Sequence, residues 1–171
     1  MLKLLGSILI IGGCSGIGFY IASRGAARIR ILRELEQILE YLYGEIEYSG
    51  CDMAELMERL SFRGGAFGDF FLGIRGKLLS HQGYRFSEYW SGELSYIHGV
   101  ENLLSEDIEL LHCIGDNLGN CDRGTQLRTI EIFKKRLEKT LAGATEEYRG
   151  KAKLSIIVCA TAGCFLAILL L

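Results

Sequence analysis

The amino-acid sequence predicts an all-α protein: a helical bundle domain between an N-terminal and a C-terminal transmembrane helix. Proline, which interrupts helices, is absent from all 171 residues. In the middle of the chain, apolar residues recur at spacings of three and four, which is the helical period. Each end of the chain is a long apolar stretch, and no stretch alternates polar and apolar residues for long enough to predict a sheet.

The C-terminal stretch, Leu154–Leu171, contains no charged residue. As a helix, its roughly 18 residues extend about 27 Å, close to the thickness of the hydrocarbon core of a bilayer. Three basic residues precede it, Arg149, Lys151 and Lys153. Because Lys and Arg next to a membrane span favour the cytoplasmic side, the stretch predicts a span with its N-terminal end facing the cytoplasm.

The N-terminal stretch, Met1–Ala22, has Lys3 as its only charge and is predicted to be a second span. Small residues recur every four positions in both spans: Gly12 and Gly16, then Cys159, Gly163 and Ala167. Such faces let helix backbones approach closely in lipid, which predicts that these residues pack helices together. Alternatively, the glycines reflect only the general abundance of glycine in membrane spans.

A second interpretation of the N-terminus is an exported lipoprotein-type binding module anchored at Cys14. The apolar run that precedes Cys14 resembles a lipoprotein signal, whose removal would place the domain outside the cytoplasm. Two features favour the membrane span instead. The residues after Cys14 stay apolar, and the next segment is strongly basic, with Arg24, Arg28, Arg30 and Arg33.

The predicted domain boundaries are a transmembrane helix over residues 1–22, a cytoplasmic helical bundle over 23–153 and a transmembrane helix over 154–171. The bundle begins with a helix over Arg24–Tyr48, which ends at Ser49-Gly50. Its apolar stripe is Leu32, Leu35, Leu39, Leu42 and Ile46. The last helix begins near Arg123 and continues to the membrane, and its inner stripe is Leu127, Ile130, Phe133, Leu137, Leu141 and Ala144. We expect these two helices to pair antiparallel.

Shorter helices are predicted between the two long ones. One carries Met53, Leu56, Met57 and Leu60, and its N-terminus is predicted to be capped by Asp52 together with Glu55. The next spans Ala66–Leu79. Ser87 and Ser105 are the expected N-caps of two further helices.

The connection before the last helix is a candidate site formed by Leu118, Gly119, Asp122 and Gln126. We expect Gly119 to end one helix with a positive φ, and Asp122 to cap the next helix. Gln126 lies one turn further on, so its amide can reach the capping loop or a neighbouring helix. Two roles are open: a corner that fixes the angle of the helical hairpin, or a corner that binds a partner.

Charge and chemistry point away from an enzyme. Residues 23–153 hold 18 basic and 21 acidic residues, which gives no electrostatic case for nucleic acid. The six cysteines are scattered, as expected of reduced thiols. His112, Cys113 and Cys121 come closest to a metal site but lack the usual ligand spacing. Because no nucleotide-binding or nucleophile motif occurs, we predict no catalytic residue, no metal and no cofactor. The glutamates of the first long helix form either a solvated face or a docking face for a basic partner.

Several short motifs resemble the stage III sporulation protein AB family. They are Glu106-Asp107 followed by Leu118-Gly119, Asp122 and Gln126, the N-terminal Met1-Leu2-Lys3-Leu4-Leu5-Gly6, and Leu42, Glu45, Ile46 and Tyr48. Together with the leucine-rich C-terminus, they extend the resemblance over the whole chain. Where family members often carry Thr-Pro, this chain has Cys51-Asp52.

The resemblance implies a membrane component of the channel between the mother cell and the engulfed forespore. It also implies a likeness to the platform protein of type II secretion machines, whose cytoplasmic modules are small helical bundles. The chain would then lie in the outer forespore membrane, with its domain facing the mother-cell cytoplasm. Its expected partners are a secretion-type ATPase, other sporulation channel proteins and membrane lipid, and association with further copies of itself is left open.

Overall fold

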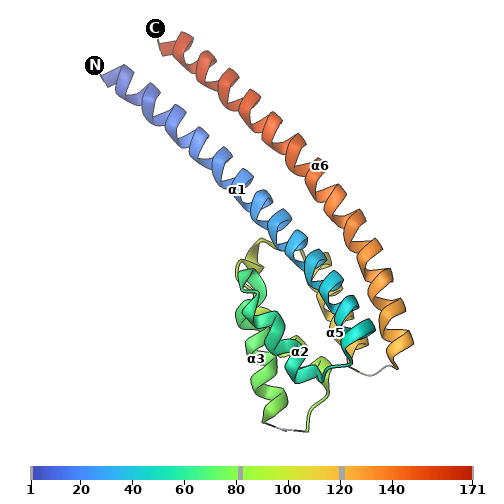
Figure 1. Cartoon of the computed structure of the whole chain (residues 1–171). Coiled ribbons are helices and arrows are strands. Elements are labelled where there is room, and N and C mark those ends of the chain that lie inside the picture. Colours follow the sequence, from blue (N-terminus) through green and yellow to red (C-terminus); the bar gives the residue numbers. More distant parts are fainter. Residues whose placement is uncertain (1, 81–82, 120–121, 171) are drawn as a thin grey trace. The chain divides into compact units, whose positions relative to one another are not determined.

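The computed structural model describes residues 2–80, 83–119 and 122–170, with side chains for residues 20, 23–80, 83–119, 122–150 and 161. Every regular element in these residues is helical, which confirms the all-α prediction (Figure 1). The α-helices are α1 (Leu2–Gly44), α2 (Met53–Phe62), α3 (Gly68–Leu79), α4 (Phe86–Glu93), α5 (Ser105–Leu118) and α6 (Arg123–Leu170). A π-helical turn spans Glu45–Ser49, and 3-10 turns span Gly65–Phe67, Leu94–Tyr96 and Val100–Asn102.

The chain divides into two compact units, and the first consists of Met1–Ile29 together with Ala142–Leu171. Within it, the first part of α1 and the last part of α6 run antiparallel. Tyr148 lies against Gly25, and Arg28 forms an ion pair with Glu147 at 3.8 Å. Gly25 is needed there, because a Cβ on it would lie 2.9 Å from Cδ2 of Tyr148.

Among the residues that the structure describes, no helix combines the length and the apolar character required to cross a membrane. The side chains of the two predicted spans lie almost entirely outside the described residues. The same holds for the predicted packing residues Gly12, Gly16, Cys159, Gly163 and Ala167, and for Cys14.

The second unit, Arg30–Leu141, contains the hydrophobic core. Most residues of the two predicted stripes are buried in it: Leu32, Leu35, Leu39 and Leu42 on α1, and Ile130, Phe133 and Leu137 on α6. The predicted stripe residues Ile46, Leu127 and Leu141 are only half-buried. Glu40 of α1 meets Lys134 of α6 at 3.3 Å, and Tyr43 interacts with Glu131. Because the later α1 residue meets the earlier α6 residue, the two segments are antiparallel, as predicted.

An aromatic cluster joins α3 to α4. Phe70 packs edge-on against Trp90 with ring centroids 4.8 Å apart, and Phe71 contacts both rings. Trp90 is 1% exposed, and its indole N–H donates to the carbonyl of Leu111 in α5 at 2.8 Å. One side chain therefore fixes three helices relative to one another, with its single polar group satisfied.

Glu34 connects α1 to the turn that precedes α3. Its Oε1 accepts a hydrogen bond from the backbone N–H of Phe67 at 3.3 Å, and its carboxylate lies directly over Gly65. Gly65 has φ +76°, and a Cβ at this position would collide with the carboxylate. The predicted helix over Ala66–Leu79 accordingly begins as a 3-10 turn and becomes α-helical only at Gly68.

The predicted N-caps of the short helices are wrong. Asp52 holds the N-cap position of α2 without a side-chain hydrogen bond, and Glu55 instead pairs with Arg59 at 2.8 Å. Helix α4 begins one residue before Ser87, and Glu88 accepts the backbone N–H of Arg85 at 3.1 Å. At α5, Ser105 is already helical.

At the start of α5, the buried carboxylate of Asp107 accepts a hydrogen bond from the backbone N–H of Leu104 at 2.9 Å. In both α4 and α5, an acidic side chain in the first turn accepts the backbone N–H of the residue just before the helix. This interaction takes the place of the predicted serine cap.

Candidate functional site

The α5–α6 corner brings together the residues singled out in the sequence. Gln126 Nε2 donates to the carbonyl oxygen of Leu118 at 2.6 Å, so its amide holds the end of α5. Asp122 accepts the backbone N–H of Thr125 at 3.2 Å and the Thr125 hydroxyl at 2.7 Å. The predicted Asp122 cap is therefore confirmed, and Gln126 does reach back across the connection. These same hydrogen bonds, led by that from the Thr125 hydroxyl, lower the pKa of Asp122.

The positive φ expected at Gly119 is wrong, because its φ is −89°. Glycine is required there for a different reason. A Cβ at Gly119 would lie within 3.0 Å of the Phe86 ring and closer still to Phe86 Cβ. The close approach of α4 to the end of α5 therefore explains this residue, and local turn geometry does not.

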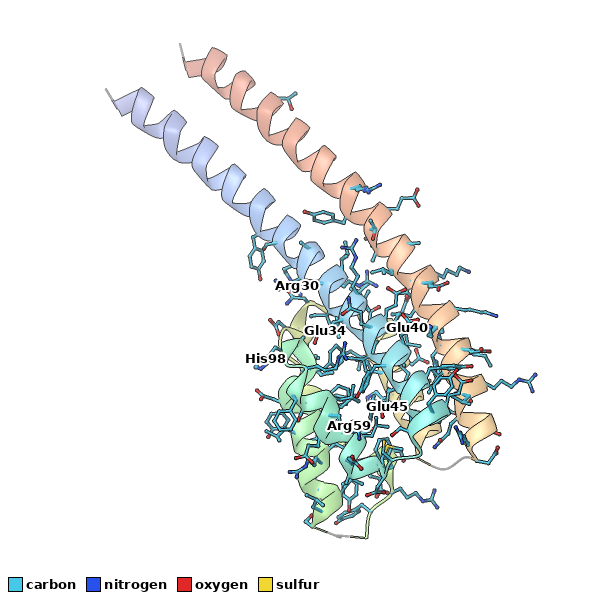
Figure 2. The ribbon with its side chains drawn as sticks, in the orientation of Figure 1. Arg30, Glu34, Glu40, Glu45, Arg59 and His98 are labelled. Carbon is cyan, nitrogen blue, oxygen red and sulfur yellow. The ribbon has the colours of Figure 1, made fainter. Side chains whose placement is uncertain are left out.

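A second polar cluster lies at the C-terminal end of α1, around Glu45. Arg59 of α2 donates to Glu45 at 2.9 Å and to Glu55 at 2.8 Å (Figure 2). The Cys51 thiol donates to Glu45 at 3.7 Å. The Tyr41 hydroxyl and these donors lower the pKa of the Glu45 carboxyl, with the Tyr41 hydrogen bond as the largest cause. Glu45, in the π-helical turn that follows α1, thus contacts both the loop before α2 and α2 itself.

Beside this cluster lies a shallow open depression lined by Gln37, Glu40, Tyr41, Gly44, Glu45 and Arg63. The Arg63 guanidinium stacks over the Tyr41 ring at 4.7 Å from its centroid, a cation–π contact that covers the ring. Burial raises the pKa of Tyr41, and its hydrogen bond to Glu45 raises it further. The depression is open, and charged side chains form part of its lining, so it suits contact with another protein surface better than enclosure of a small molecule.

This cluster was not predicted from the sequence. The sequence pattern that could have indicated it is a spacing of four residues, between Tyr41 and Glu45 in one segment and between Glu55, Arg59 and Arg63 in the next. Those spacings place the groups on one face of each helix. They do not reveal that the two faces meet.

The structure describes two of the three residues considered for metal binding, His112 and Cys113. In the described part of the chain, no three His, Cys, Asp or Glu side chains are placed to hold a metal ion. His112 is exposed, and its Nδ1 lies 2.9 Å from the Ser91 hydroxyl. Cys51 and Cys113 are free thiols and are half-buried. Cys121 lies outside the described residues.

These features define a class of protein: an all-α scaffold whose described polar groups mainly join one helix to another. Comparison with known proteins identifies the family. The family model for stage III sporulation protein AB matches residues 3–171. The chain belongs to the stage III sporulation protein AB family, and its general role is therefore in sporulation.

Two similar proteins agree with this assignment. Stage III sporulation protein AB of Bacillus subtilis (strain 168) is 26% identical over 179 residues, covering 100% of both chains. A solved structure of a stage III sporulation protein AB has a TM-score of 0.64 at 22% identity, covering 72% of this chain and 97% of that one. The solved structure supports the fold of this chain.

Proposed function

We propose that this chain is a membrane-anchored, non-enzymatic platform component of the sporulation channel between mother cell and forespore. In this role it couples a cytoplasmic secretion-type ATPase to the membrane-embedded parts of the channel. One observation carries the proposal: this family member divides into two units. The first unit pairs the two terminal helical segments, and the second, Arg30–Leu141, is a helical body. The terminal segments serve as the anchor, and the body serves as the docking module.

Charge supports this division of roles. The terminal unit holds six basic and two acidic residues, whereas the unit Arg30–Leu141 holds 13 basic and 19 acidic residues. Basic residues next to apolar ends favour the cytoplasmic side of a membrane. An acidic body is repelled by an anionic lipid surface and stays available to protein partners. The chain then has both ends outside the mother-cell cytoplasm and its body inside it, in the outer forespore membrane.

The polar contacts of the body support a role without catalysis. Its described ion pairs and caps, such as Glu45–Arg59 and Asp122–Thr125, join helices or helix ends. Such contacts suit a rigid module that holds its binding partners in fixed positions.

Recruitment of the ATPase to membranes tests the coupling. We expect the ATPase to sediment with membranes from sporulating cells that contain this chain, and to remain soluble in cells that lack it. A variant that lacks only residues 154–171 should accumulate and yet fail to bring the ATPase to the membrane. Equal membrane recruitment with and without the chain would contradict the coupling. Incorporation of a fatty acid at Cys14, with loss of the preceding residues, would favour the lipoprotein alternative.

A further inference from the structure

Helix α6 presents a basic stripe to solvent within the unit Arg30–Leu141. The stripe consists of Arg128, Ile132, Lys135 and Lys139, which are spaced by four, three and four residues and therefore share one helix face. All four are exposed, and Ile132 is 59% exposed. The opposite face of the same segment is buried in the core. One exposed apolar side chain therefore lies among three exposed cations on this face.

The cations of this stripe have no carboxylate partner within the part of the chain that the structure describes. Lys134, the residue next to Lys135, forms an ion pair with Glu40, but no such pair involves Arg128, Lys135 or Lys139. The surrounding segment, residues 123–141, holds six basic and two acidic residues. Its excess positive charge faces solvent.

The complementary surface lies on the preceding helix. Helix α5 is 14 residues long and contains no Lys or Arg. Its carboxylates Glu106, Glu109 and Asp116 are exposed, and no described residue forms an ion pair with them. Residues 34–122 hold 17 acidic and five basic residues, and three of the five, Arg59, Arg75 and Lys77, already pair with carboxylates.

We propose that the basic stripe of α6 docks on the exposed acidic face of α5 in a second copy of this chain. Three cations at helical spacing meet three carboxylates at helical spacing, and Ile132 is covered at the centre of the contact. The chain itself therefore carries both halves of a charge-complementary interface, and such complementarity fixes partner and register. This inference concerns the association of copies and stands apart from the proposed coupling to an ATPase.

Photo-crosslinking in sporulating cells tests the contact with the full chain at its native level. With p-benzoyl-phenylalanine in place of Ile132, we expect a crosslinked dimer whose linked peptide comes from α5. Reversing the stripe (Arg128→Glu, Lys135→Glu, Lys139→Glu) should lower the dimer yield about tenfold or more. Reversing α5 (Glu106→Lys, Glu109→Lys, Asp116→Lys) should do the same, and combining the two sets should restore the dimer.

Single substitutions supply a matched control. Lys135→Glu should lower the dimer yield, whereas Arg123→Glu should leave it near the wild-type level. Arg123 is also an exposed cation of α6, but it lies five residues before Arg128 and therefore on another face of the helix. Crosslinking should also weaken in membranes washed at high salt, because exposed charges are screened.

The proposal is overturned if Ile132 gives no dimer, if the link maps outside α5, or if the combined reversal stays as weak as either set alone. It is also overturned if the α6 reversal only weakens binding of the purified chain to phosphatidylglycerol vesicles and leaves the dimer unchanged. That result would assign the stripe to an anionic membrane surface.

Discussion

The indole of Trp90 in α4 lies across Gly115 in α5, which has no side chain of its own to hold the two helices apart. A Cβ at Gly115 would lie 2.9 Å from Trp90 Cβ and closer still to its ring. The indole N–H is simultaneously bonded to Leu111, which prevents the ring from moving aside. Gly115 is thus a packing requirement of the core.

Replacement of Gly115 by alanine should therefore destabilise the fold by about 1–3 kcal/mol through overpacking. Gly76→Ala is the control, because Gly76 is also helical and a Cβ there has nothing within 4 Å. This control should raise stability by roughly 0.5–1 kcal/mol. Trp90 is the only tryptophan, so the unfolding of both variants can be followed by its fluorescence. Equal midpoints for the two variants would contradict the packing.

Truncation of Leu39 tests the pairing of the long helices. Leu39 is 0% exposed, and Leu39→Ala should cost about 2–5 kcal/mol in the free energy of unfolding. Leu72→Ala removes the same atoms from a residue that is 54% exposed, and should change stability by no more than about 0.5 kcal/mol. If Leu39→Ala is as mild as Leu72→Ala in urea unfolding, the helix pairing is misassigned.

Glu45 makes the fold sensitive to acid. Its pKa is lowered in the folded state, so its carboxylate contributes stability above the unfolded value of 4.5, and this stability is lost as the pH falls through the lower folded value. Glu45→Gln should therefore be less stable than the wild type at neutral pH, and the difference should shrink below pH 4.5. Melting temperatures measured across this window check the prediction. A difference that stays constant with pH would show that the charge of Glu45 is not involved.

Gln126 separates the two roles of the α5–α6 corner. Gln126→Ala leaves the carbonyl of Leu118 without its side-chain donor, and should cost about 1 kcal/mol of stability. If the corner only fixes the hairpin angle, any loss of sporulation should follow the loss in melting temperature. A variant that is fully stable and yet fails to recruit channel partners would assign the corner to an interface. A variant that is stable and fully functional would reject both roles.

The two long helices could be predicted from the sequence because their burial repeats locally. Leu35, Leu39 and Leu42 follow the helical period, and the period alone marks the buried face. The ion pair of Glu40 with Lys134 could not be predicted, because no local pattern specifies which turns of two helices meet. The same holds for the Tyr41–Arg63 stack.

The errors at the helix ends have a related cause. Serine was expected to cap α4 and α5, but Glu88 and Asp107, in the first turns, accept the N–H groups of the residues before those helices. Several residues near each helix start can satisfy the free N–H groups, and the sequence does not choose between them. The prediction for Gly119 relied on local turn geometry. The contact that requires glycine there comes instead from Phe86, in another helix.

The side of the membrane on which the body lies tests the platform account most directly. Cys51 is a free, half-buried thiol on the body, and a membrane-impermeant maleimide can report its location. In sporulating cells, the account predicts that the Cys51 peptide stays unmodified in intact cells and becomes modified once the mother-cell membrane is permeabilised. Modification of Cys51 in intact cells would place the body outside the mother-cell cytoplasm, and would contradict both the topology and the coupling to a cytoplasmic ATPase.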